Sequence, residues 1–352
     1  MNIIHKTLLT VLLAVVSIVA VAQQQKSLVL KRENAAHEFS NDIPAGNYSG
    51  IVYIGDNLYA LVSDKGKGEI VFVRINIDGT TGDILSAIHE FSLPTGERNG
   101  DNEDIVYCDK TKMFYIVSEE DNIAREFSIE KIAHDGQITS TGKTLGFGDL
   151  KGATYPNRGM ESLAYNGNDG IFWTTTECPL RFDGDMATSE NNIRQRLRLI
   201  STDKDGNTRQ YAYIMDAAES STGMKTFLVG VSAITSLGNG ILFVLEREIH
   251  IPEEYLGAFS IMKVYAVDIN VEKEVPASEA LSDDSPFVGK RLICQWRTTL
   301  GLFDQALANY EGMCLGPKLA DGSQVVVLVS DSQNQYAGVL RDWFKTFVVG
   351  YE

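Results

Sequence analysis

The sequence is poor in the residues that most often build catalytic or metal centres. It has 5 histidines and 4 cysteines in 352 residues. It contains no G-x-S-x-G, H-E-x-x-H or G-x-x-x-x-G-K motif, which argues against a serine-hydrolase elbow, a histidine zinc site and a phosphate-binding loop. Four of the histidines, His37, His89, His134 and His250, are scattered outside the repeated segments described below. A serine triad or a histidine metal site therefore has little support.

The cysteines form no C-x-x-C pair, which excludes zinc-ribbon and thioredoxin-type motifs. They are Cys108, Cys178, Cys294 and Cys314. An oxidising compartment would permit disulfides, but a chain of this length buries a core without cross-links. We expect buried free thiols.

Positive charge is also scarce, because the formal net charge is -16 and no run of Lys and Arg occurs. Nucleic-acid binding needs clustered basic residues to neutralise phosphates, so that class of partner is excluded. The negative surplus also disfavours binding to an anionic membrane surface. It favours divalent cations as partners.

The N-terminus has the pattern of a secretory signal peptide. Lys6 precedes an apolar run at 8–20, and Ala20-Val21-Ala22 is a small-x-small cleavage site. The run is too short to span a bilayer comfortably, and the polar tract from Gln23 follows it directly. We expect a signal peptide at 1–22 and one monomeric domain at 23–352 in the periplasm or outside the cell. A retained membrane helix is the alternative.

One pattern occurs five times in the remaining chain. Each copy begins with Ser or Glu, continues as an apolar strand with period-two alternation, turns through Gly, Asn or Asp, and ends in a second strand with polar or acidic residues. The copies are residues 49–64, 103–119, 161–177, 232–247 and 311–331. Further strand pairs lie between them, and their spacing widens toward insertions at 217–229 and 272–290, where we expect lids or short helices. The pattern predicts an all-β fold, a β-propeller of four-stranded blades, with a β-sandwich as the alternative.

The polar ends of these hairpins are expected at one mouth of the channel, because the two ends of an antiparallel hairpin lie together. The residues expected there are Ser49, Asp64, Glu103, Glu119, Glu161, Glu177, Ser232, Glu246, Glu311 and Asp331. Crowded carboxylates must take up protons, recruit cations or pair with arginine, and calcium accepts such irregular oxygen sets. Arg158 and Arg247 adjoin the ring, so a mixed site for a phosphate or a carboxyl ester is predicted. Hydrated rim residues without a role are the alternative.

Several segments of the chain resemble the phytase-like family, described as "esterase-like activity of phytase". They are 48–64, 157–163, 231–247 and 309–331, and the resemblance extends from about Tyr48 to Val349. It implies a propeller of about six blades with hydrolytic, esterase-like or phosphoesterase activity. Because only five copies are visible, one blade would be degenerate or built from both termini, with candidate strands at 28–30 and 346–349. The chain departs from the family pattern at Ser162, where glycine is common, and at Ala233.

The residues and the resemblance together predict a metal-assisted hydrolase of phosphoesters or carboxyl esters that acts on a small anionic or ester substrate. The predicted catalytic residues are Glu161, Arg158, Arg247 and Glu311. The predicted ligands of a divalent cation, calcium in the first place, are Glu103, Glu161, Glu311, Asp331, Asp64, Glu177 and Glu246. Two alternatives remain open at this point, a non-catalytic propeller with structural calcium that binds a ligand or partner, and a calcium-dependent lactonase.

Overall fold

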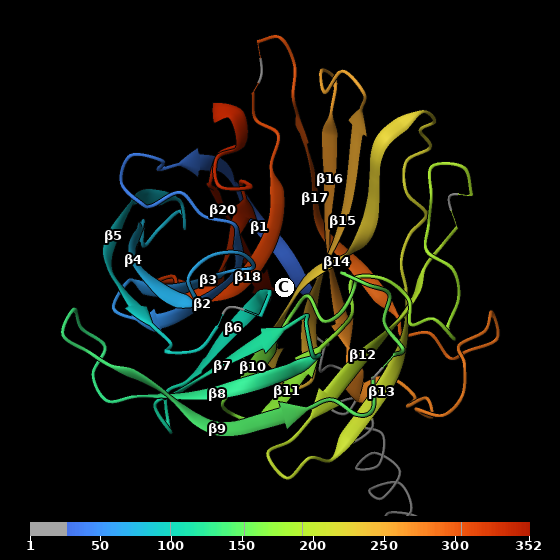
Figure 1. Ribbon diagram of the computed structural model, residues 1–352, viewed down its shortest axis with the longest axis horizontal. Helices are drawn as coiled ribbons and strands as arrows, with labels where there is room; N and C mark the ends of the chain where they lie inside the picture. Colours follow the sequence, from blue (N-terminus) through green and yellow to red (C-terminus); the bar gives the residue numbers. More distant parts are fainter. Residues whose placement is uncertain (1–26, 99, 151, 192, 304) are drawn as a thin grey trace, which may run out of the picture.

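A computed structural model describes residues 27–352 except positions 99, 151, 192 and 304, so the predicted signal peptide lies outside the described residues. The described chain folds into twenty strands, which form five four-stranded antiparallel sheets. The sheets stand in a ring around a common axis (Figure 1). The predicted β-propeller is confirmed, but the predicted number of about six blades is wrong, because the ring has five. Within the described part of the chain, no helix has the length and apolarity needed to cross a membrane.

The strands follow one another outward within each of the first four blades. Blade 1 contains β2 (Tyr48–Gly55), β3 (Leu58–Ser63), β4 (Glu69–Ile77) and β5 (Ile84–Pro94). Blade 2 contains β6 (Asn102–Cys108), β7 (Met113–Ser118), β8 (Ile123–Ile129) and β9 (Ile138–Gly146). Blade 3 contains β10 (Ala164–Asn166), β11 (Ile171–Thr174), β12 (Arg196–Thr202) and β13 (Thr208–Ile214). Blade 4 contains β14 (Met224–Gly238), β15 (Ile241–Pro252), β16 (Phe259–Asp268) and β17 (Lys290–Thr299).

Blade 5 joins the two ends of the described chain. It contains β18 (Asn309–Lys318), β19 (Gln324–Asp331), β20 (Trp343–Tyr351) and, as its outermost strand, β1 (Leu28–Glu38). Leu28 pairs with Tyr351 and Leu30 pairs with Val349. The two candidate strands therefore lie side by side as predicted, but they complete the fifth blade and do not form a sixth.

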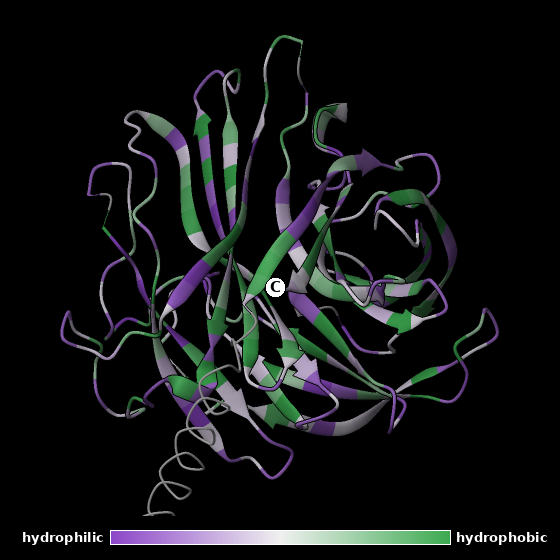
Figure 2. Cartoon of the chain, turned by 180° about the vertical axis from the view of Figure 1, so that it is seen from behind, coloured by the Kyte–Doolittle hydropathy of each residue, from purple (hydrophilic) through white to green (hydrophobic). Residues whose placement is uncertain are grey.

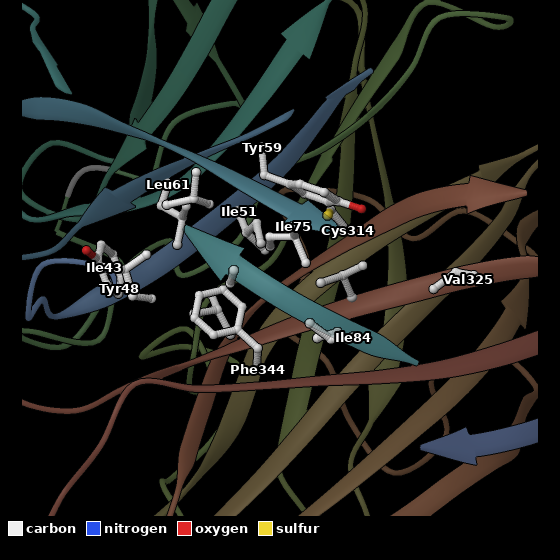
Figure 3. Packing of buried hydrophobic residues seen from close by; sticks show 14 of the residues in the cluster. Ile43, Tyr48, Ile51, Tyr59, Leu61, Ile75, Ile84, Cys314, Val325 and Phe344 are labelled. Carbon is white, nitrogen blue, oxygen red and sulfur yellow. The ribbon is translucent and has the colours of Figure 1, made fainter. Parts of the chain in front are cut away.

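The core is divided among the gaps between blades. Five clusters of buried apolar side chains each join two neighbouring blades, which gives one cluster for every gap of the ring. Figure 3 shows the cluster between blades 1 and 5, in which Tyr59 and Ile75 pack near Val325 and Phe344. Hydrophobic residues run along the strands of the blades, and many connecting loops are hydrophilic (Figure 2). Burial of these faces against each neighbour stabilises the closed ring.

The five repeated segments of the sequence are the inner hairpins of the five blades. They are β2–β3, β6–β7, β10–β11, β14–β15 and β18–β19. Their first strands contact one another in order around the axis. These strands line an axial cavity of about 160 Å³, walled by apolar residues such as Ile51, Ile105 and Leu163.

The two insertions form neither a lid nor a regular helix in the described residues. Part of the first insertion extends β14, which begins at Met224. The second follows a single 3-10 turn at Ile269–Val271 and packs on the outer strand of blade 3, where Ala212 forms a bridge with Phe287. Its apolar residues Val275 and Leu281 are buried against Ala212, and this burial holds the segment on blade 3. The four cysteines are buried and free, as expected.

Candidate active site at one mouth of the channel

The first residue of most inner hairpins lies at a β-bulge. The strand register shifts by one residue across Ser49, Glu103, Ser232 and Glu311. In blade 3 the corresponding Glu161 follows an isolated bridge between Met160 and Thr176. A bulged residue is left out of the ladder and its side chain is re-aimed. The bulges therefore turn one side chain in each of blades 1, 2, 4 and 5 away from the regular sheet faces.

The two serines at these positions connect neighbouring blades. Ser49 Oγ donates a hydrogen bond to Asn102 O at 2.6 Å, which links blade 1 to blade 2. Ser232 Oγ donates to Tyr310 O at 3.0 Å, which links blade 4 to blade 5. The glutamates at the other three positions, Glu103, Glu161 and Glu311, interact electrostatically with one another at the mouth.

A second polar residue comes from the end of each inner hairpin. Asp64, Glu119, Glu177 and Asp331 each follow a Ser or Thr that pairs with the residue before the bulge. In blade 4 the residue that pairs there is Glu246, opposite Val231, so the equivalent position belongs to Arg247. The structure therefore places Arg247, and not Glu246, in the ring, in contrast to the predicted ligand set.

Glu246 points between blades 3 and 4. Its carboxylate accepts hydrogen bonds from Tyr213 Oη at 2.7 Å, from Lys290 Nζ at 2.5 Å and from the Asp216 backbone N–H at 3.2 Å. Because successive side chains of a strand point to opposite faces, the one-residue difference in register removes Glu246 from the mouth.

Arg247 is buried and bridges three blades. Its Nη1 donates to Glu311 Oε1 at 2.5 Å and to Asn309 Oδ1 at 2.9 Å in blade 5, and its Nη2 donates to Glu177 Oε1 in blade 3. Glu177 reaches it across Gly230, where an added Cβ would lie 2.5 Å from Glu177 Cγ. A glycine is required at this close approach. Arg247 thus fixes two acids of the mouth in place.

Arg158 is the more accessible of the two arginines of the site. Its Nη1 lies 2.8 Å from Glu177 Oε2, and its side chain keeps 36% of its surface exposed, against 2% for Arg247. The neighbouring Gly159 N–H donates to Glu119 Oε1 at 2.6 Å, which holds the loop of Arg158 against blade 2. Arg158 can therefore meet a solute anion while Arg247 stays covered.

Glu103 and Glu161 are buried acids without a cation of their own. They are 6% and 9% exposed, and among the described residues neither lies within ion-pair distance of a Lys or Arg side chain. Burial raises the pKa of both carboxyls well above the usual value. Neighbouring acids, Glu161 for Glu103 and Glu177 for Glu161, raise it further. Burial therefore favours the neutral, protonated form of these two carboxyls more than that of an exposed glutamate.

Two acids of blade 5, Glu311 and Asp331, also have raised pKa values. Burial and the nearby Asp331 raise the pKa of Glu311 to about 8. Burial raises the pKa of Asp331 to about 6, although a hydrogen bond from the Gln333 N–H opposes the rise. Asp64 lies 3.1 Å from Lys65 Nζ, and its buried Oδ1 has no hydrogen-bond partner in the described structure. Raised pKa values thus occur at the mouth in blades 2, 3 and 5.

The donors at the mouth are carboxylate oxygens, the type that calcium prefers. Within the described ranges, however, no three Asp, Glu, His or Cys side chains converge closely enough to hold a metal ion. The predicted cation site thus stays a prediction, and its acids would have to move together to bind one.

A family model described as phytase-like, esterase-like activity of phytase, matches residues 43–333. The chain belongs to the phytase-like family. The match covers all five inner hairpins up to Asp331, and it confirms the resemblance found in the sequence. No curated protein matches the phytase-like chain.

Solved structures similar to the phytase-like chain share little sequence with it. A carbohydrate-active enzyme of family AA12 from Trichoderma reesei is 10% identical, with a TM-score of 0.40 and coverage of 94% of this chain and 97% of that one. The periplasmic gluconolactonase PpgL of Pseudomonas aeruginosa is 11% identical, with a TM-score of 0.33 and coverage of 70% and 88%. The hydrazine synthase of Kuenenia stuttgartiensis is 9% identical, with a TM-score of 0.37, and 83% of this chain spans only 58% of that chain.

Proposed function

We propose that this phytase-like propeller hydrolyses phosphoesters or carboxyl esters at the mouth that carries Arg158 and Glu161. The observation that supports the proposal is the pair of buried acids, Glu103 and Glu161, which lack a paired cation of their own. Buried acids with strongly raised pKa values are typical of sites that transfer protons, and Arg158, which pairs with Glu177 at the same mouth, offers an accessible charge for an anion.

Each side chain of the mouth has a different role in the proposed reaction. Arg158 binds the anionic or developing negative oxygen of the substrate, because it is the exposed member of the arginine pair. Arg247 holds Glu177 and Glu311 at fixed positions. In its protonated form, which burial favours, Glu161 donates its proton to the oxygen of the leaving alcohol, while a water molecule attacks the phosphorus or carbonyl carbon.

A divalent cation would take the place of protons on the same carboxyls. Glu103, Glu161, Glu311 and Asp331 would hold it, and it would supply charge stabilisation to the reacting ester. Since these acids have raised pKa values, cation binding must release protons and must strengthen as the pH rises.

The test is a panel of aryl phosphates, aryl esters and lactones, assayed with calcium and with a chelator. Glu161→Gln keeps the size of the side chain but fixes it as neutral and removes its proton transfer, so we expect a loss of about 100-fold or more in turnover. The control is Glu120→Gln, since Glu120 is an exposed acid paired with Arg98 outside the inner hairpins. Hydrolysis by Glu161→Gln at the rate of the unmodified protein would overturn the assignment.

A second function is favoured by the bonding of Arg247. Its guanidinium is held by groups from blades 3 and 5, so the mouth also works as a joint between blades. In a non-catalytic ligand-binding propeller this joint would be the main role of the charges. The same panel distinguishes the two functions, because a binding protein would show no turnover, and chelation would lower only its unfolding temperature.

A further inference from the structure

A second polar cluster lies on the other face of β15. Glu246, Glu248 and His250 alternate with Arg247 along this strand, so their side chains point away from the axis and toward blade 3. The connection between β13 and β14 contributes Ser221 to the same place. Ser221 Oγ lies 2.6 Å from His250 Nδ1, and His250 Nε2 lies 3.5 Å from Glu248 Oε2. A hydroxyl, an imidazole and a carboxylate are therefore arranged in series.

The imidazole of His250 is fixed by aromatic packing. Its ring stacks on Phe259 with centroids 4.2 Å apart and an interplanar angle of 14°, and the edge contact with Phe227 has centroids 5.0 Å apart. The residue is fully buried. The ring thus has one orientation, in which Nδ1 faces the serine and Nε2 faces the acid.

Glu248 is also held in place. Its Oε1 accepts from Lys263 Nζ at 2.7 Å, and its Oε2 accepts from the Glu219 backbone N–H at 2.8 Å. A carboxylate beside Nε2 favours the tautomer with the proton on Nε2. Nδ1 then carries the lone pair that can accept the proton of Ser221.

We propose that Ser221, His250 and Glu248 form a nucleophilic serine site for carboxyl esters, separate from the mouth. Ser221 is half-buried and so can be reached by a substrate, unlike His250.

The reaction balances with the groups present. Ser221 Oγ bonds to the carbonyl carbon of the ester while its proton passes to His250 Nδ1. The bond between that carbon and the alcohol oxygen then breaks, and the alcohol leaves with the proton from His250. Water attacks the acyl-serine in the second half, giving its proton to His250 and then to Ser221, and releases the carboxylic acid.

The test uses an alkyl fluorophosphonate, which reacts with activated serines by forming an Oγ–P bond and releasing fluoride. We expect one adduct per full-length chain, located at Ser221 by peptide mapping. Ser220→Ala, which removes the adjacent exposed hydroxyl, should be labelled at the normal rate, and Ser221→Ala should not be labelled. His250→Asn preserves a hydrogen-bonding side chain near Ser221 but removes the base, so the labelling rate should fall by about 100-fold or more.

The outcome is independent of the mouth. Glu161→Gln should leave labelling of Ser221 unchanged, so failure of the hydrolase proposal and failure of this proposal are distinguishable. Thermal unfolding of each variant shows whether it is folded before the rates are compared. Labelling of Ser221 no faster than that of Ser220, or normal labelling in a folded His250→Asn variant, would overturn the proposal and make the Ser221–His250 contact a structural hydrogen bond.

Discussion

The acids on the two sides of β15 differ in whether a Lys or Arg side chain pairs with them. On the axial face Arg247 joins three blades, yet the nearby Glu103 and Glu161 have no paired cation among the described residues. On the other face each acid has a partner, Lys290 for Glu246 and Lys263 for Glu248. Because successive side chains of a strand point to opposite faces, β15 separates a site in which Glu103 and Glu161 lack paired cations from a cluster in which each acid has one.

Replacing Arg247 is expected to cause the largest loss in the free energy of unfolding. Arg247→Leu leaves Glu311 buried without its cation and leaves Glu177 with only the partly exposed Arg158, which should reduce the free energy of unfolding by about 3 to 5 kcal/mol. Urea denaturation measures the change. Adding Glu177→Gln and Glu311→Gln should restore part of the loss, because neither side chain then carries a buried negative charge, and the partly exposed Arg158 is left to solvent. An unchanged midpoint for the single variant would show that the three-blade joint is dispensable.

The dependence of stability on pH should differ in sign between the faces. The pKa of Glu311 is raised from 4.5 to about 8 in the fold, so its contribution to stability falls as the pH rises through this range. Burial opposes ionisation of Glu248, but hydrogen bonds from His250 and Lys263 outweigh it and lower the pKa of Glu248 below 4.5. Its contribution is present above 4.5 and is lost as the pH falls.

These two trends can be measured by thermal unfolding across pH in the presence of a chelator. Glu311→Gln should flatten the decline of the unfolding temperature between pH 4.5 and about 8. Glu248→Gln should flatten only the acid side. If both variants changed the same side of the profile, the two faces would not be electrostatically distinct.

Arg158→Gln is expected to affect substrate binding more than folding. The side chain is partly exposed, so its ion pair with Glu177 contributes less than about 1 kcal/mol to stability. Loss of a charge-assisted hydrogen bond to the substrate should raise KM for an aryl phosphate by about 10- to 100-fold. A lysine at this position should recover part of the binding, and an unchanged KM in both variants would remove Arg158 from the site.

Tyr213→Phe should cause only a small loss of stability and no change in activity. It removes the hydroxyl that donates to Glu246 but leaves Lys290 and the Asp216 N–H as partners, so a loss of about 1 kcal/mol is expected. The change lies on the side of β15 away from the mouth, and kcat for the ester panel should stay the same. A lower kcat would connect Glu246 to the mouth and would contradict the separation of the faces.

The inner hairpins were predictable because their signals are local. Alternating apolar residues and Gly, Asn or Asp turns identified β2–β3 and the four equivalent hairpins, and the order of the strands then set the blades. The blade number was wrong because the resemblance implied six, whereas β1 only supplies the missing strand of blade 5.

The side-chain geometry depended on features that no local pattern encodes. Glu246 and Arg247 are adjacent and both charged, and only the one-residue bulge at Ser232 decides which of them faces the axis. Ser221, His250 and Glu248 come from a loop and an extended strand end, and no motif spacing connects them. The acids of the mouth were predicted, but whether they bind a cation stays a prediction.

The pairing of β1 with β20 has a consequence for synthesis. The strand at residues 28–38 leaves the ribosome long before its hydrogen-bonding partner at 343–351. Until then blade 5 lacks two strands, and the apolar side chains that Figure 3 shows between blades 1 and 5 face water. A nascent or truncated chain without β20 would therefore expose apolar side chains and an unpaired strand edge. Both features favour aggregation, and the synthesis of β20 removes them.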